Sequence, residues 1–301
     1  MRTFLFFFFS AIVFAQTPKV SSGKIIEHVD FKSNIIGQRT VRVWLPYNYS
    51  PKRKHQVLYV NDGQMLWDAN ITWNKQEWKL DETLSKLLKE KKIKPTIVVA
   101  VDNAGKNRHS EYFPQKPFES LSQKTQDSLY SLYRNKDQTI YNDKVYSDNY
   151  LKFLVEELKP FIDQNYSTYK DASNTFIMGS SMGGLISMYA VCEYPKVFGG
   201  NLSLSTHWPG VFATENNPIP GAFMKYLQKS LPDPNTHKLY FDYGTETLDA
   251  LYEPYQLKAD EIIKAKGYTN KNWKSLKFSG KDHSEKAWAE RLDIPLVFML
   301  K

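Results

Sequence analysis

The stretch with the clearest chemical potential is a serine flanked by glycines. Residues 179–183, Gly-Ser-Ser-Met-Gly, form a G-x-S-x-G pattern. Apolar residues typical of a strand precede it at 175–178, and a helical pattern follows it at 185–191. A sharp strand-to-helix turn built from small residues can hold a serine in a strained, exposed position at the end of a sheet, as a nucleophile elbow does. We therefore take Ser181 as the candidate nucleophile.

A serine is a poor nucleophile near neutral pH, so it needs a base that accepts its proton. Histidine suits this task because its ordinary pKa is about 6.5. His283 lies in a loop directly after the last predicted strand, at 273–278. The remaining histidines lie outside the expected loops, come too early in the chain or begin a strand: His28, His55, His109, His207 and His237. We expect His283 to be the base.

A carboxylate must hold the histidine in the correct tautomer. Candidates lie near the end of the penultimate predicted strand, at 238–243. Asp249 is favoured because it falls in the loop or at the start of the next helix, and Glu246 is the alternative. Asp242 is still inside the strand, and Asp282 would have to fold back onto its neighbour in sequence.

The elements that position these residues alternate between strands and helices. Two segments with period-two alternation, at 24–31 and 39–45, predict an antiparallel opening pair. Later apolar runs predict buried strands, and the segments between them have helical spacing. The pattern predicts an α/β fold with a mostly parallel central sheet, antiparallel N-terminal strands and helices on both faces.

Several loops leave the carboxyl edge of this sheet. We expect Arg108 and Glu111 to pair and brace the loop after the strand at 96–101. Residues 113–146 lack a clear period, so they predict an insertion that acts as a lid or binding loop. Four aromatic residues are candidates for a substrate platform that would bind a sugar or a phenolic acyl group: Trp67, Trp73, Tyr112 and Trp208.

The bulk composition limits the class of protein. The chain has 301 residues with one cysteine, Cys192, so no intramolecular disulfide framework can form. No linker divides the sequence, and we expect one domain over 16–301. The formal net charge of +8 is scattered and accompanies no nucleic-acid motif, so we expect no nucleic-acid partner. We expect no organic cofactor, and no metal-ligand spacing is present.

The first residues resemble an export signal. Arg2 precedes a short apolar run that ends in Val13-Phe14-Ala15. A single positive charge, a short apolar run and a small residue at the cleavage point predict a signal peptide over 1–15. We expect an exported protein, periplasmic or secreted, without a stable membrane anchor. The sequence specifies no oligomeric state.

Taken together, these motifs resemble the esterase family of α/β-hydrolases that includes esterase-D-like, feruloyl-esterase-like and enterobactin-esterase-like proteins. The resemblance covers roughly residues 24–300, and four motifs carry it: 57–59 with 62–64, 179–184, 244–249 and 282–285. It implies an α/β-hydrolase fold, in which the nucleophile, the acid and the base follow one another along the chain. It also implies that Ser181 is the nucleophile and His283 the base.

The resemblance further implies an oxyanion hole formed by the backbone N–H groups of Gln64 and Met182. One departure concerns the acid, because feruloyl-esterase-like members carry Asp three residues after a glycine and this chain has Thr247 there. Glu246 or Asp249 must then take the role.

We therefore expect a serine carboxylic-ester hydrolase that works through an acyl-enzyme. Its expected partner is a small-molecule or glycan ester, either an acylated carbohydrate or an aryl ester such as a feruloyl or acetyl ester. The alternatives are a siderophore trilactone esterase, an acyltransferase, or a non-catalytic binding module on the same fold.

Overall fold

The computed structural model describes residues 17–212 and 215–301. The expected signal peptide at 1–15 therefore lies outside the described residues. Within the described part of the chain, no helix is long and apolar enough to cross a membrane.

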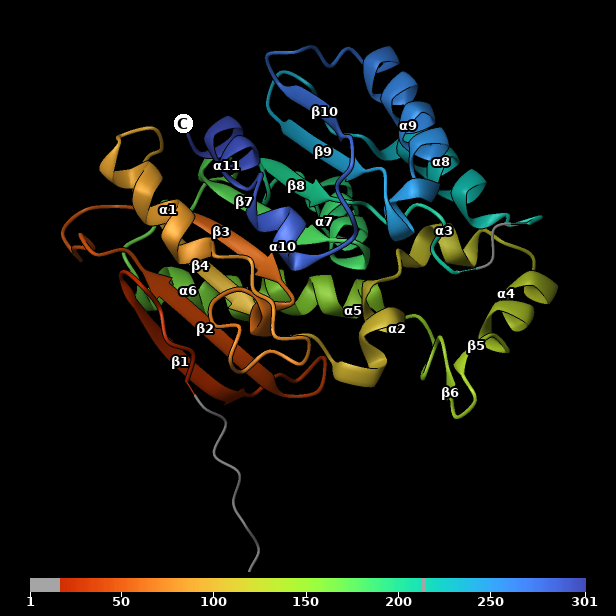
Figure 1. The fold of residues 1–301 in the computed structure, drawn as a ribbon, viewed down its shortest axis with the longest axis horizontal. Helices are drawn as coiled ribbons and strands as arrows, with labels where there is room; N and C mark the ends of the chain where they lie inside the picture. The colour runs from red at the N-terminus through yellow and green to blue at the C-terminus, as the bar shows by residue number, and fades with distance from the viewer. Residues whose placement is uncertain (1–16, 213–214) are drawn as a thin grey trace, which may run out of the picture.

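A twisted eight-stranded sheet forms the centre of the molecule (Figure 1). Its strands, in order across the sheet, are β1 (Lys24–Phe31), β2 (Arg39–Leu45), β4 (Thr96–Val101), β3 (Gln56–Asn61), β7 (Thr175–Ser180), β8 (Gly200–Leu204), β9 (Lys238–Gly244) and β10 (Trp273–Phe278). β2 pairs antiparallel with both β1 and β4, and the remaining neighbours are parallel. The expected fold class is confirmed.

Helices and short helical turns connect the strands. The α-helices are α1 (Leu80–Lys89), α2 (Arg108–Tyr112), α3 (Gln115–Glu119), α4 (Gln123–Tyr130), α5 (Ser147–Lys152), α6 (Lys159–Asn165), α7 (Met182–Glu193), α8 (Ile219–Ser230), α9 (Glu253–Ala265), α10 (Glu285–Ala289) and α11 (Asp293–Leu300). A stretch of π-helix, η3 (Phe153–Leu158), joins α5 to α6, and four 3₁₀ turns are η1 (Gly63–Met65), η2 (Gly105–Asn107), η4 (Ala172–Asn174) and η5 (Thr247–Leu251).

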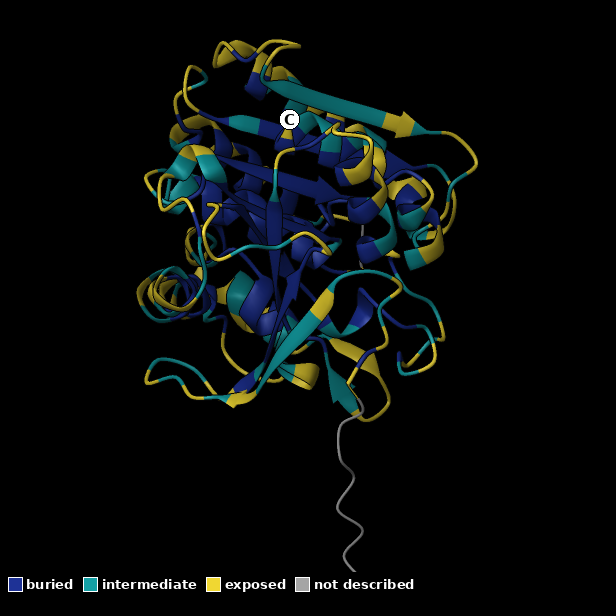
Figure 2. Cartoon of the chain, turned by 90° about the vertical axis from the view of Figure 1, so that its left-hand side faces the viewer, coloured by how far each residue is buried: buried dark blue, intermediate teal, exposed yellow. Residues whose placement is uncertain are grey.

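The core lies on both faces of the sheet. Successive residues of a strand point to opposite faces, and in β3 Val57 and Tyr59 pack into one apolar cluster while Leu58 and Val60 pack into another. The first cluster contains residues of α5 to α9, and the second contains residues of α1, α10 and α11. Figure 2 shows the central strands as buried and the outer turns of the helices as exposed. Because both faces are covered, a central strand such as β4 is a nearly continuous apolar run, Thr-Ile-Val-Val-Ala-Val.

The candidate site lies where the chain reverses its direction across the sheet. β3 and β7 are parallel neighbours, but α1, which follows β3, covers one face and α7, which follows β7, covers the other. The connections therefore separate at the carboxyl ends of these two strands and leave a crevice there, which is the usual ligand site of an open α/β sheet.

The insertion at 113–146 has regular structure that its sequence does not reveal. It contains α3, α4 and a two-stranded sheet formed by β5 (Tyr133–Asn135) and β6 (Gln138–Thr139). Figure 1 shows α4, β5 and β6 standing away from the central sheet, on the right of the view.

Candidate active site

The serine motif folds into a strained turn. β7 ends at Ser180, α7 begins at Met182, and Ser181 between them has φ 56° and ψ −122°. A positive φ is uncommon for residues other than glycine, and such backbone strain persists only where the surrounding structure enforces it. A Cβ atom on Gly179 would lie 2.4 Å from the carbonyl oxygen of Gly183, so the first glycine is required. The turn therefore has the shape of a nucleophile elbow.

The structure brings Asp249, and not Glu246, to the candidate base. Oδ1 of Asp249 lies 2.5 Å from Nδ1 of His283. Asp249 is 1% exposed, whereas the side chain of Glu246 is exposed and interacts with Thr245. The pKa of Asp249 is raised by burial, but hydrogen bonds from His283 and its other donors outweigh burial and hold it below its ordinary value. Asp249 is thus suited to remain ionised beside the imidazole.

A buried polar network fixes the second oxygen of Asp249. Oδ2 accepts hydrogen bonds from the Ser205 hydroxyl at 2.5 Å and from the Gly244 N–H at 2.6 Å. The Ser205 hydroxyl in turn accepts from Trp288 Nε1 at 2.9 Å and from Arg291 Nη2 at 3.0 Å. Because every proton on these donors is committed, the carboxylate has one defined orientation. No local spacing in the sequence reveals this network, since its members come from distant loops.

A second histidine lies behind the nucleophile. Nδ1 of His207 is 2.8 Å from the Tyr252 hydroxyl, and the Tyr252 side chain interacts with Ser181. The Tyr252 ring also meets the His283 ring edge to face, with centroids 5.8 Å apart. Burial lowers the pKa of His207 well below its ordinary value, so this imidazole stays neutral. Sequence reasoning placed His207 at a strand end but missed this contact, because Tyr252 belongs to the next loop.

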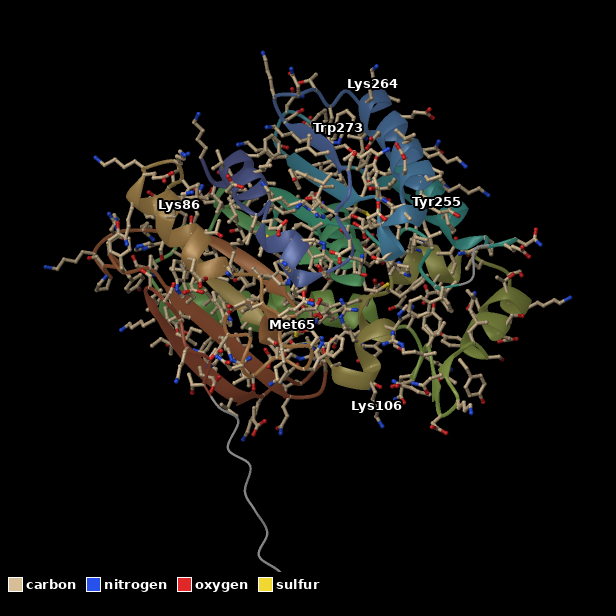
Figure 3. All side chains as sticks on the ribbon, in the orientation of Figure 1. Met65, Lys86, Lys106, Tyr255, Lys264 and Trp273 are labelled. Atoms are coloured by element: carbon tan, nitrogen blue, oxygen red, sulfur yellow. The ribbon has the colours of Figure 1, made fainter. Side chains whose placement is uncertain are left out.

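Ser181 and His283 face a common pocket of about 540 Å³. It is also lined by Asp62, Gln64, Met65, Trp73, Asn74, Gln76, Trp78, Asn103, Arg108, Arg134, Ser180, Ser284, Glu285 and Trp288. Met65, which Figure 3 labels, lines this pocket, whereas the labelled Lys86 and Lys264 are exposed on α1 and α9. The pocket therefore combines the elbow, the loop after β3, the histidine loop and the insertion.

The two expected oxyanion donors lie at the ends of adjacent strands. Gln64 follows β3 and Met182 follows β7, and these strands are paired. Met182 occupies the first position of α7, where the helix itself leaves backbone N–H groups without an intrahelical acceptor. The Gln64 side chain accepts a hydrogen bond from the backbone N–H of Asn103 at 3.2 Å, which ties this turn to the loop after β4.

Three of the four expected platform residues are corrected by the structure. Trp67, Tyr112 and Trp208 are at most 2% exposed, and none lines the pocket. The Trp208 indole donates to Gln256 at 2.8 Å, which fixes it in the interior. A loop residue next to a strand end can face the core or the solvent, and the sequence does not reveal which. These three side chains face the core. Trp73 is 83% exposed and lines the pocket, so it alone of the four is placed to contact a ligand.

The expected pairing of Arg108 with Glu111 is also wrong. Arg108 forms two hydrogen bonds with Asp62, at 2.6 and 2.8 Å, and Glu111 pairs with Arg39 at 2.8 Å. Both partners come from neighbouring strands or their loops, which sequence spacing does not reveal. Within residues 17–212 and 215–301, no group of three or more His, Cys, Asp or Glu is placed to hold a metal ion.

Comparisons with solved structures match the whole architecture. A ferulic acid esterase superposes with a TM-score of 0.64 at 15% identity, covering 93% of this chain and 98% of the other. The ferric enterobactin esterase of Salmonella typhimurium gives a TM-score of 0.64 at 17% identity, covering 94% of this chain and 59% of the other. At these identities the likeness establishes the fold.

Sequence relatives cover less of the chain. The uncharacterized protein YjcH of Bacillus subtilis (strain 168) is 24% identical over 193 residues, which are 64% of this chain and 65% of the relative. An endo-1,4-beta-xylanase/feruloyl esterase of Xylanibacter ruminicola is 28% identical over 204 residues, 65% of this chain and 24% of that protein. The chain thus spans less than two thirds of the length of these relatives.

A family model also matches most of the chain. The model described as "Putative esterase" matches residues 33–295, which include the elbow, the acid loop and the histidine loop. Together with the fold, this match fits the motifs from which the resemblance was drawn. The chain therefore belongs to this esterase family.

Proposed function

We propose that the protein is a serine carboxylic-ester hydrolase with Ser181 as nucleophile, His283 as base and Asp249 as acid. One observation carries the proposal: His283 contacts Asp249 at 2.5 Å through Nδ1 and lines the same pocket as Ser181 at its strained turn. These are the three roles that acyl transfer to serine requires, in the chain order of α/β-hydrolases.

The geometry supports a two-step reaction. Nδ1–H of His283 donates to the ionised Asp249, so Nε2 carries the lone pair that takes the proton of Ser181. The serine oxygen attacks the ester carbonyl, and the backbone N–H groups of Gln64 and Met182 stabilise the oxyanion, an effect worth about 10²–10³ in rate for each donor. His283 then protonates the leaving alcohol, an acyl-enzyme remains, and water activated by the same histidine releases the acid.

The substrate class we propose is an acylated carbohydrate or an aryl ester. The exposed indole of Trp73 at the pocket rim supports it, because aromatic faces pack against sugar rings and phenolic groups. The name of the Xylanibacter ruminicola relative, which includes a feruloyl esterase, agrees with this choice. Export remains a prediction from the first residues of the chain.

Replacement of the nucleophile tests the proposal. With 4-nitrophenyl acetate and methyl ferulate as substrates, Ser181→Ala should lower kcat about 10⁶-fold, the scale seen when a triad serine is removed. Cys192→Ala is the matched control for the alternative thiol nucleophile and should keep its activity, because burial raises the pKa of this thiol and keeps it protonated. Equal activity of wild type and Ser181→Ala on every ester tried would refute the proposal.

Burst kinetics separate hydrolysis from acyl transfer. A rapid release of 4-nitrophenol equal to the enzyme concentration, followed by a slower steady rate, would show the acyl-enzyme. Adding a small alcohol then measures how the acyl group divides between water and the alcohol. A hydrolase releases mostly free acid under these conditions, and a transferase releases mostly the new ester.

A further inference from the structure

The pocket contains one cation that no carboxylate neutralises. Arg134 lies on β5 in the insertion, and its exposed side chain lines the pocket that contains Ser181 and His283. Within the described parts of the chain, no ion pair and no side-chain hydrogen bond holds its guanidinium. Its recorded contact is with the ring of Phe212, 5.8 Å from the guanidinium carbon.

The other charged groups of the pocket have partners. Arg108 donates two hydrogen bonds to Asp62, so its donors are occupied and its charge is paired with a carboxylate. Glu285 accepts a hydrogen bond from Asn74 at 2.7 Å and lies near Arg108, whose pKa its charge helps to raise. Arg134 therefore supplies a positive charge whose five N–H donors remain available to a ligand.

The charged group that acts on the pKa of Arg134 is a second cation, Arg108. Burial and the charge of Arg108 both lower the pKa of Arg134. Arg134 in turn helps to lower the pKa values of His109 and His207, which are buried and neutral beneath the pocket. Two cations that face one cavity repel each other, and an anion between them relieves that repulsion.

We propose that Arg134 binds an anionic oxygen group, such as a carboxylate, carried by the ester substrate. The planar guanidinium matches a carboxylate through two parallel hydrogen bonds, and the ring of Phe212 supports its face. Arg108 strengthens the potential at this end of the pocket while its own donors stay with Asp62. The inference rests on the proposed ester hydrolysis and adds the charge of the preferred substrate.

In the proposed reaction Arg134 takes no part in proton transfer or in stabilising the oxyanion. Such a contact binds the ground state and the transition state alike, so its loss raises KM and leaves kcat nearly unchanged. An arginine that served only to hold the insertion in place would instead change the kinetics of charged and neutral substrates equally. The two roles are therefore distinguishable.

Matched ester pairs test the inference. On the acyl side, the 4-nitrophenyl monoesters of succinic, glutaric and adipic acid are compared with neutral esters of the same chain length. On the alcohol side, 4-carboxyphenyl acetate is compared with 4-carbamoylphenyl acetate. Arg134→Gln should lower kcat/KM about 5- to 20-fold for at least one anionic ester, mostly through KM, and leave its neutral partner within about twofold.

Two further variants sharpen the result. Arg134→Lys keeps the charge but loses the planar fork, so it should fall between wild type and Arg134→Gln. Lys136→Gln removes the same charge from the same hairpin, but Lys136 does not line the pocket, so its substrate ratios should match wild type. Equal anionic-to-neutral ratios in wild type and Arg134→Gln for every pair would overturn the inference.

A binding measurement separates this inference from the proposed function. Calorimetric titration of Ser181→Ala with the anionic esters does not require turnover, and Arg134→Gln in that background should weaken binding by a similar factor. If Ser181→Ala hydrolyses esters as fast as wild type, the proposed function fails while the Arg134 comparison still stands. If hydrolysis depends on Ser181 but anionic binding ignores Arg134, this inference alone fails.

Discussion

The loops at the carboxyl edge of the sheet and the insertion at 113–146 both reach the pocket, but they hold their side chains differently. Asp249 is 1% exposed and accepts one hydrogen bond each from His283, Ser205 and Gly244. Arg134 is exposed and rests against a single ring. The sheet edge fixes the groups whose positions must be accurate to a fraction of an ångström, and the insertion offers a group that needs only to reach its ligand.

The insertion is not flexible throughout. The base of the insertion joins the main core through aromatic packing, in which the ring of Phe113 lies 5.6 Å from that of Tyr141 and 5.3 Å from that of Phe223 on α8. Its outer hairpin, in contrast, is mostly exposed. A change at the hairpin can therefore alter which ester binds without disturbing the groups proposed to cleave it, as loops on a rigid scaffold generally allow.

Between the two regions compared, the largest expected effect concerns the proposed acid, Asp249. Asp249→Asn should lower kcat about 10⁴-fold, the scale seen when an amide replaces a triad carboxylate, because the amide no longer stabilises the correct tautomer of His283. Glu246→Gln is the matched control and should stay within about twofold of wild type, since its side chain is exposed. Turnover of 4-nitrophenyl acetate measures both, with circular dichroism as the check on folding. A large loss in Glu246→Gln alone would reverse the assignment of the acid.

A smaller but still large effect is expected at the elbow. Gly179→Ala would place a Cβ atom 2.4 Å from the Gly183 carbonyl oxygen, which is backbone and cannot rotate away. We expect the free energy of unfolding to fall by about 3 kcal/mol or more. Gly221→Ala in α8 meets no atom within 4 Å and should raise it by about 0.5–1 kcal/mol. Denaturant unfolding measures both variants, and equal stability of the two would contradict the crowded elbow.

The fold could be predicted from sequence because its signals are local. Alternation at 24–31 and 39–45 corresponds to β1 and β2, and the apolar run at 96–101 is β4. Glycine spacing around Ser181 reflects a steric requirement within five residues, so the elbow was also visible. The insertion was not, because its helices are too short to form alone and pack through aromatic contacts with one another and with the core.

The site could be predicted only where one residue type and the chain order were sufficient. His283 was selected in this way, whereas the choice between Glu246 and Asp249 required knowledge of which side chain turns inward. The partners of Arg108 and Glu111 were mispredicted because a charge pairs with whatever the neighbouring strand presents. Trp67 was assigned to a surface for the same reason, since a loop residue carries no periodicity that reveals its direction.

The smallest effect concerns the stability of the protein at low pH, where His109 packs against the inner end of the insertion. His109 is buried, its Nε2 lies 2.8 Å from the Gly210 carbonyl oxygen, and its ring meets Tyr141 edge to face. Burial, with a contribution from Arg134, lowers the pKa of His109 to about 3. An unfolded chain has the ordinary value of about 6.5, so it binds a proton more readily between these two values. Stability from this group is complete above about pH 6.5 and declines as pH falls below it.

The decline should reach about 1.4 kcal/mol for each pH unit, and His109→Gln should remove it because glutamine can donate to Gly210 without titrating. Denaturant unfolding of both proteins at pH 7 and pH 5 measures the difference in slope. Burial lowers the pKa of His207 in both proteins, so this part of the pH dependence is common to them. Hydrogen exchange should show the amides around Tyr141 losing protection before those of the central sheet. Equal slopes of the free energy of unfolding against pH would mean that His109 does not link the insertion to the core. The contrast between a rigid inner end and an exposed hairpin would then have to rest on other contacts.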